Sequence, residues 1–281
     1  MSQVAYLLIA STDLLIVGHA LGAATVVIYS CTSKLITVLQ NQPQTFAGMA
    51  LPGLTQMKVS ESRKRIQQTT TSLTQGMLLL TGAVFCVVLA VNRQFVTFWL
   101  GPQFFGGMRL TILVLLNFLA AQVDYTFTIA MFAFGHERFM SIRMLVSGAI
   151  SVVLAGILVR HLGMEGVPLG LLCGTLFVAI PADAFILIRE FEISVFRLFR
   201  PYIPYLWRFA LVGGAGVAVM LRIGKPTLWS VVIDAISVGA LYLLVVFPYV
   251  WRSPLRSYIE STITVLRTAL RSHFLGIAND G

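Results

Sequence analysis

Three ionisable residues, Asp13, Lys34 and Asp124, lie inside stretches of the chain that are otherwise apolar. Several such stretches approach or exceed the ~20 residues that cross a ~30 Å hydrocarbon layer as a helix. A charge at the centre of a membrane helix costs about 2.5–3.5 kcal/mol on insertion scales unless it faces protein or water. Ionisable residues at this depth usually belong to ion or solute pathways, so we expect a functional role for all three. A purely structural pair of Lys34 with Asp13 is the alternative.

Polar residues share one face of the helix that carries Lys34. At about 100° per residue, a single stripe holds Ser30, Lys34, Thr37, Asn41, Thr45 and Gly48. The segment with Asp124 repeats the pattern, with Asn117 and Thr128 on the same face. Such residues also join helices by hydrogen bonds, which stays open for each hydroxyl group taken singly. Together with the charges, the pattern favours a water-accessible cavity, and the candidate site residues are Asp13, Lys34, Thr37, Asn41, Asn117 and Asp124.

The remaining reactive side chains have simpler interpretations. Asp183 and Asp234 lie nearer helix ends, where solvated carboxylates are common. His19 and His136 lie at the ends of apolar segments without a second ligand at helical spacing, so no metal site is expected. The three cysteines, Cys31, Cys86 and Cys173, lie in apolar runs without a CxxC pair, which indicates packing residues.

Composition places the chain among integral membrane proteins. It has 281 residues, of which 57% are hydrophobic and 11% charged, with a mean hydropathy of +0.86. The apolar runs are nearly continuous rather than alternating, so we predict an all-α, polytopic membrane helix bundle. Turn signals and charges separate about eight transmembrane helices, at roughly 3–20, 23–57 with a kink at Pro43, 68–92, 108–133, 139–160, 166–188, 206–223 and 227–250.

Lysine and arginine favour cytoplasmic loops and so predict the orientation. If every segment crosses once, one side holds fourteen basic residues: Lys58, Arg63, Lys64, Arg65, Arg138, Arg143, Arg189, Arg197, Arg200, Arg208, Arg252, Arg256, Arg267 and Arg271. The other side holds five: Arg93, Arg109, Arg160, Arg222 and Lys225. Both termini are therefore expected to be cytoplasmic. The net charge of +9 does not imply a nucleic-acid partner, because attraction to anionic membrane lipids accounts for it.

The last part of the chain, residues 252–281, is expected to form a cytoplasmic amphipathic tail. Its apolar residues share one helical face: Leu255, Ile259, Ile263, Leu266 and Leu270.

Nothing in the chain predicts an enzyme or a cofactor. There is no HExxH, no GxSxG and no glycine-rich phosphate loop.

Several motifs, taken in order, resemble a known family. They are TDLLIVGHALGAATVVIYSCTSKL from Thr12, LPGLTQM from Leu51, FWLGPQFFGGMRLTILVLLNFLAA from Phe98, and FGHERFMSIRMLVSGAISVVLAGILVRHLGMEGVPLGLLCGT from Phe134. The series looks like the carboxy-terminal half of a bacterial polysaccharide exporter, an O-antigen or lipid-linked oligosaccharide flippase. That group belongs to the multidrug, oligosaccharidyl-lipid and polysaccharide exporter superfamily. The resemblance covers roughly residues 5–190, and the later helices match by hydropathy only.

The resemblance implies a MATE-like architecture of two six-helix lobes around a cavity, often followed by two further helices. Residues 1–190 would form one six-helix lobe, residues 191–251 two additional helices, and the amino-terminal lobe would be missing or replaced by a second copy. The implied function is the flipping of a lipid-linked oligosaccharide across the bacterial inner membrane for cell-surface polysaccharide synthesis. Lys34 would attract a diphosphate or acidic sugar. Asp13 and Asp124 would bind the coupling proton or sodium ion.

Two other functions stay open at this point. The chain would be a multidrug or small-solute cation antiporter if its cavity were narrower and lined by more aromatic residues. It would be a scaffold subunit of a polysaccharide assembly complex, or a nonfunctional fragment, if it transported nothing.

Overall fold

The computed structural model describes residues 12–60, 62–220 and 227–251. Within these ranges almost every residue is helical and no strand is present, which confirms the all-α prediction. The amphipathic helix expected in residues 252–281 and the start of the first expected segment lie outside the described residues.

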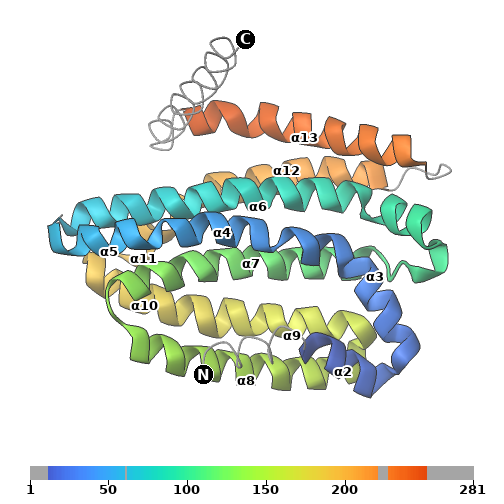
Figure 1. Cartoon of the computed structure of the whole chain (residues 1–281), viewed down its shortest axis with the longest axis horizontal. Coiled ribbons are helices and arrows are strands. Elements are labelled where there is room, and N and C mark those ends of the chain that lie inside the picture. The colour runs from blue at the N-terminus through green and yellow to red at the C-terminus, as the bar shows by residue number, and fades with distance from the viewer. Residues whose placement is uncertain (1–11, 61, 221–226, 252–281) are drawn as a thin grey trace, which may run out of the picture.

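The described helices include five segments long and apolar enough to cross a membrane: Ala23–Met57, Arg63–Trp99, Met108–Ala133, Glu137–Phe191 and Leu228–Val250. Two shorter apolar helices are Thr12–Leu21 and Ile203–Val219. The helices run side by side, with α13 (Leu228–Trp251) at one edge of the bundle and α8 (Glu137–Leu162) near the other (Figure 1). A multi-pass helical bundle is therefore present, and the count of eight crossings stays a prediction.

The first long segment is divided into α3 (Ala23–Leu39), α4 (Asn41–Met49) and α5 (Leu51–Ser60). The divisions fall at Gln40 and Ala50, shortly before Pro43 and Pro52. A proline has no N–H for the carbonyl four residues earlier, and its ring crowds that turn. At the first division, Gln122 on α7 (Met108–Ala133) donates a hydrogen bond to the Gln40 carbonyl, with an N–O distance of 3.4 Å.

Helices α6 (Arg63–Trp99) and α7 form the centre of the bundle. The loop between them contains the short helix η1 (Pro102–Phe104) and is anchored by buried polar groups. The Asn92 amide donates to the Thr32 carbonyl at 2.9 Å and to the Thr111 hydroxyl at 3.1 Å. The Gly106 N–H donates to the Thr32 hydroxyl at 2.7 Å. The Gly106 bond fixes the loop against α3, and the Asn92 bonds join α6 to α3 and α7 beside it.

The chain reverses at Gly163, whose φ of +63° favours glycine, and α9 (Gly166–Gly174) returns along α8. Three glycines, Gly166, Gly170 and Gly174, face α8 along this contact. A β-carbon at Gly170 would overlap the backbone of Ala155. This spacing of small residues lets two helices approach closely. The segment continues through the π-helical turn η3 (Thr175–Ala179) into α10 (Ile180–Phe191).

The short α11 (Val195–Phe199) leads to α12 (Ile203–Met220), and α12 and α13 pack against α6 and each other. Aromatic side chains fill this contact. The Tyr242 hydroxyl donates to the Leu79 carbonyl at 2.6 Å, and the ring of Tyr242 stacks on Phe209 with centroids 5.9 Å apart. At the opposite side of the bundle, α2 (Thr12–Leu21) packs against α3 and α8. The chain turns at Gly22, between α2 and α3.

The glycine contact predicts a specific loss of stability. Gly170→Ala should destabilise the fold by about 1–3 kcal/mol, because the added methyl group forces α9 away from the Ala155 backbone. Gly156→Ala is the matched control, since a β-carbon at this α8 position meets no atom within 4 Å. Thermal unfolding of the purified proteins in detergent measures both. Equal unfolding temperatures for the two variants would contradict the predicted close packing.

Candidate functional site

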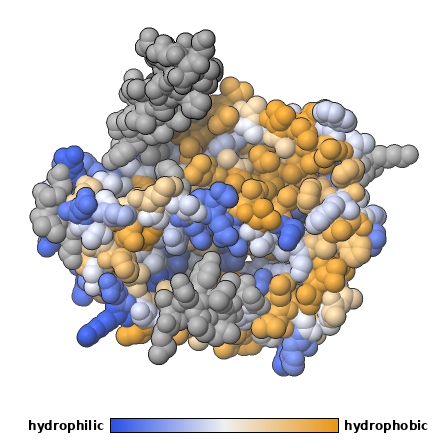
Figure 2. Space-filling view, viewed as in Figure 1, coloured by the Kyte–Doolittle hydropathy of each residue, from blue (hydrophilic) through white to orange (hydrophobic). Residues whose placement is uncertain are grey.

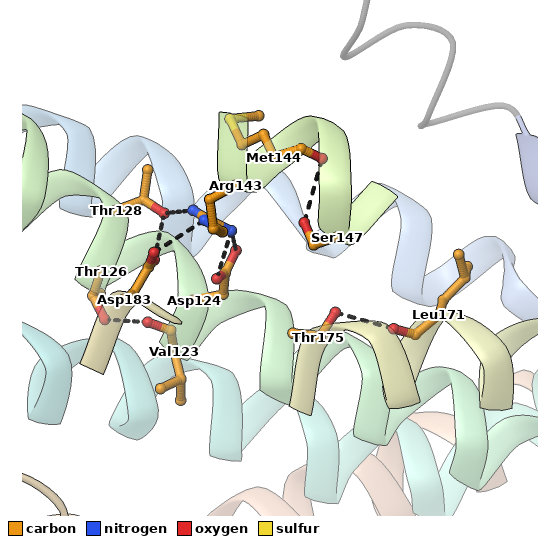
Figure 3. Close-up of polar contacts among 10 residues, drawn as sticks. All are labelled: Val123, Asp124, Thr126, Thr128, Arg143, Met144, Ser147, Leu171, Thr175 and Asp183. Carbon is orange, nitrogen blue, oxygen red and sulfur yellow. Dashed lines mark hydrogen bonds and ion pairs between the residues drawn. The ribbon is translucent and has the colours of Figure 1, made fainter. Parts of the chain in front are cut away.

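Arg143 on α8 forms ion pairs with two carboxylates from two other helices (Figure 3). Its Nη1 lies 3.0 Å from Oδ1 and 3.2 Å from Oδ2 of Asp124 on α7. Its Nε lies 3.0 Å from Oδ1 of Asp183 on α10. Its Nη2 donates to the Thr128 hydroxyl at 2.7 Å, and that hydroxyl donates to Asp183 Oδ2 at 3.3 Å. We call Asp124, Thr128, Arg143 and Asp183 the arginine cluster.

The arginine cluster is nearly closed to the exterior. The side chain of Arg143 is 5% exposed and that of Asp183 is 0% exposed, whereas that of Asp124 is 22% exposed. Charges removed from water need close, well-directed partners, and a guanidinium supplies several donors in a fixed plane. Of the three charged members, Asp124 is therefore the one that is open to the outside.

Local features of the chain bring these residues together. The turn at His136 starts α8, so Arg143 lies nearly two helical turns inside it, about 9 Å along the axis. Pro181 has no N–H to continue the α-helical pattern, and the preceding turn widens into the π-helix η3. Asp183 follows directly in the first turn of α10 and is buried against α7 and α8.

Two sequence interpretations are wrong in this region. Asp183 is not a solvated carboxylate at a helix end, because its side chain is buried inside the bundle and pairs with Arg143 of α8. Arg143 was counted with the loop charges, yet it is buried and paired. The signal for Arg143 was present in the chain, since the turn GHER marks the helix start well before it.

The polar stripe lies on the exposed side of α3 and α4. Lys34, Thr37, Asn41 and Thr45 are all exposed, and Ser30 and Gly48 are half-buried. Figure 2 shows hydrophilic residues over α4 in the middle of this face, beside a hollow. The apolar side of the same segment packs into the core through Ile36, Ala47 and Leu54. The polar stripe of this membrane-length segment is thus exposed, beside the exposed apolar side chains of Val27, Val38 and Met49.

Other helices show the opposite arrangement. Between residues 142 and 157, the large exposed side chains of α8 are all apolar, namely Ile142, Leu145, Val146, Ile150, Val153 and Ile157. On α13 they are Leu228, Trp229, Val232, Ile233, Ile236, Leu243, Leu244 and Phe247. These surfaces suit lipid, whereas the stripe on α3 and α4 suits water or another protein.

The other predicted site residues lie apart from the arginine cluster. Asp13 is half-buried on α2 and interacts with the buried Tyr29, and within the described residues it forms no ion pair with Lys34. Asn117 is half-buried on α7, two turns before Asp124. Asp234 on α13 accepts a hydrogen bond from Gln94 at 2.7 Å. His136 pairs with Glu190 at 2.7 Å, and His19 is exposed.

Comparisons with known proteins assign no family to this chain. No family model, no curated protein and no solved structure matches the chain. The description of the site therefore depends on the residues and their contacts alone.

The exposed stripe predicts a difference in cysteine accessibility. In a background without Cys31, Cys86 and Cys173, Asn41→Cys in native membranes should react with a water-soluble thiol reagent, because Asn41 is exposed on the polar stripe. Leu145→Cys should react far more slowly, because it lies on the apolar face of α8.

The two positions are matched in depth, since Asn41 adjoins the Gln40–Gln122 contact and Leu145 adjoins the Arg143–Asp124 contact. Equal reaction rates would show that the stripe is covered by protein or lipid.

Proposed function

We propose that the chain forms one wall of an aqueous cavity in an exporter that moves a lipid-linked oligosaccharide across a membrane. The observation that supports this proposal is the exposed polar stripe on a membrane-length helix. Lipid offers no hydrogen-bond partner to Lys34 or Asn41, so this face needs water or a polar solute beside it. Hydroxyl, amide and ammonium groups in one row suit a ligand rich in hydroxyl groups that also carries negative charge.

Lys34 is the residue that we assign to the anionic part of such a ligand. Its ammonium group is exposed on the stripe and forms no ion pair within the described part of the chain. A cation in a cavity bounded by apolar helices acts on an anion more strongly than in bulk water. A prenyl diphosphate or an acidic sugar supplies that anion.

A multidrug cation antiporter fits this stripe less well. The residues of the stripe, from Ser30 to Gly48, are polar or small, and none has an aromatic ring to stack on a hydrophobic cation. The exposed ammonium group of Lys34 would also repel a positively charged drug. The polar composition therefore favours a sugar-bearing anion.

The proposal includes eight membrane crossings. The segment Glu137–Phe191 folds back on itself at Gly163 and supplies two, and the shorter helices Thr12–Leu21 and Ile203–Val219 supply one each. With both termini cytoplasmic in a bacterial inner membrane, the basic residues at the start of α6 face the cytoplasm. The opposite wall of the cavity comes from an amino-terminal lobe or a second copy of the chain.

Ligand binding tests the role of Lys34. In the full chain in lipid nanodiscs, Lys34→Ala should weaken binding of a prenyl-diphosphate oligosaccharide about 10- to 100-fold, the loss expected for a hydrogen bond to a charged group. Lys34→Arg keeps the charge and should bind within a few-fold of the unmodified chain. Binding that is indifferent to both changes, or that a hydrophobic cation dye competes away, would reject the proposal.

Labelling of intact cells tests the orientation. In the same cysteine-free background, His161→Cys should react with a membrane-impermeant thiol reagent, because it adjoins the turn at Gly163 on the side with few basic residues. Lys64→Cys at the start of α6 should react only after the membrane is opened. The reverse pattern would invert the orientation without affecting the fold.

A further inference from the structure

The arginine cluster contains more negative than positive charge. Two carboxylates, Asp124 and Asp183, share the single guanidinium of Arg143. The guanidinium keeps its charge under all ordinary conditions, so the three ionised groups would carry a net charge of −1. An uncompensated charge in a buried, low-dielectric site is costly, and it is normally removed by a bound ion or a proton.

Within the described residues, no further charged side chain neutralises the excess negative charge of the arginine cluster. Among the described residues, no other acidic or basic side chain forms an ion pair with any member of the cluster. On the three helices themselves, the nearest other charged residues are Arg109, Arg138 and Arg189, each more than one helical turn from the cluster member on its helix. The other titratable groups on the same or packed helices are Asp13, His19, Tyr29, Cys31, Lys34, Lys58, Arg63, Lys64, Arg65, Cys86, Arg93, Tyr125, Glu137, Arg160, His161, Glu165, Cys173, Glu190 and Arg197.

We propose that Asp124 and Asp183 together hold one exchangeable proton. The proton neutralises one carboxylate, and the other carboxylate balances Arg143. A metal ion fits poorly, because the carboxylate oxygens already lie 3.0–3.3 Å from guanidinium nitrogens or the Thr128 hydroxyl. Asp124 is the point of entry, since its side chain is 22% exposed while that of Asp183 is 0% exposed.

This inference deepens the proposed function, because the proton would be the ion that the exporter exchanges for its substrate, and to that extent it rests on that function. The proton site itself is defined by the cluster and is measured without transport. A failure of oligosaccharide binding at Lys34 would leave the proton site standing, and the reverse also holds.

Infrared spectroscopy of the full chain in liposomes tests the site. At neutral pH the unmodified protein should show a carboxylic-acid C=O band that shifts in deuterium oxide. Asp124→Asn and Asp183→Asn should each lose this band, because a single remaining carboxylate is balanced by Arg143. Arg143→Gln should raise the band about two-fold, because two buried carboxylates without a cation each need a proton.

Asp234→Asn is the control, since Asp234 lies on α13 and pairs with Gln94 away from the cluster. It should keep the band. The inference is overturned if the unmodified protein has no such band, or if the band survives in both Asp124→Asn and Asp183→Asn. It is also overturned in favour of a sodium site if the band disappears when sodium replaces potassium in the buffer. The unmodified protein and the two asparagine variants decide the question even if Arg143→Gln does not fold.

Discussion

A polar group inside a bilayer must find its partner in protein or in water, because the hydrocarbon offers none. The described part of the chain meets this constraint in two ways, with one exception. Hydroxyl groups bond back along their own helix, as Ser33 does to the Tyr29 carbonyl and Thr74 to the Thr70 carbonyl. Arg143, Asp124 and Asp183 join three helices in one buried cluster. Lys34 and Asn41 on the stripe are the exception, since the protein leaves them exposed, whereas Thr37 and Thr45 bond back along their own helix.

Hydropathy and helical periodicity predicted the parts of the structure that depend on neighbours along the chain. The long apolar helices, the division before Pro43 and the common face of Lys34, Thr37 and Asn41 all follow from local sequence. The partners of Asp124 did not, because Arg143 and Asp183 come from other helices and their contacts depend on tertiary packing. Asp183 was misread for a related reason. It lies only a few residues before the expected end of its helix, yet packing against α7 and α8 buries it beside Arg143.

The close contact between α8 and α9 and the arginine cluster depend on each other. Glycines at 166, 170 and 174 remove the side chains that would hold the two helices apart, so α9 lies directly on α8. The chain leaves this contact through η3, and α10 then presents Asp183 to a guanidinium on the same α8. An ion pair of 3.0 Å needs this approach, since a wider separation of the helices would leave Arg143 and Asp183 buried without each other.

Helix α7 connects the cluster with the polar stripe. Asp124 contributes the exposed part of the cluster, and Gln122, on the same turn, donates its hydrogen bond to Gln40 at the point where the first long segment is divided. A helix is stiff over one turn, so a movement of α7 that separates Asp124 from Arg143 also moves Gln122 against α3 and α4. The stripe residues Thr37 and Asn41 lie on either side of that contact. The arginine cluster and the stripe are therefore joined by one short stretch of α7, which would connect the proposed proton mechanically to the surface proposed to face the ligand.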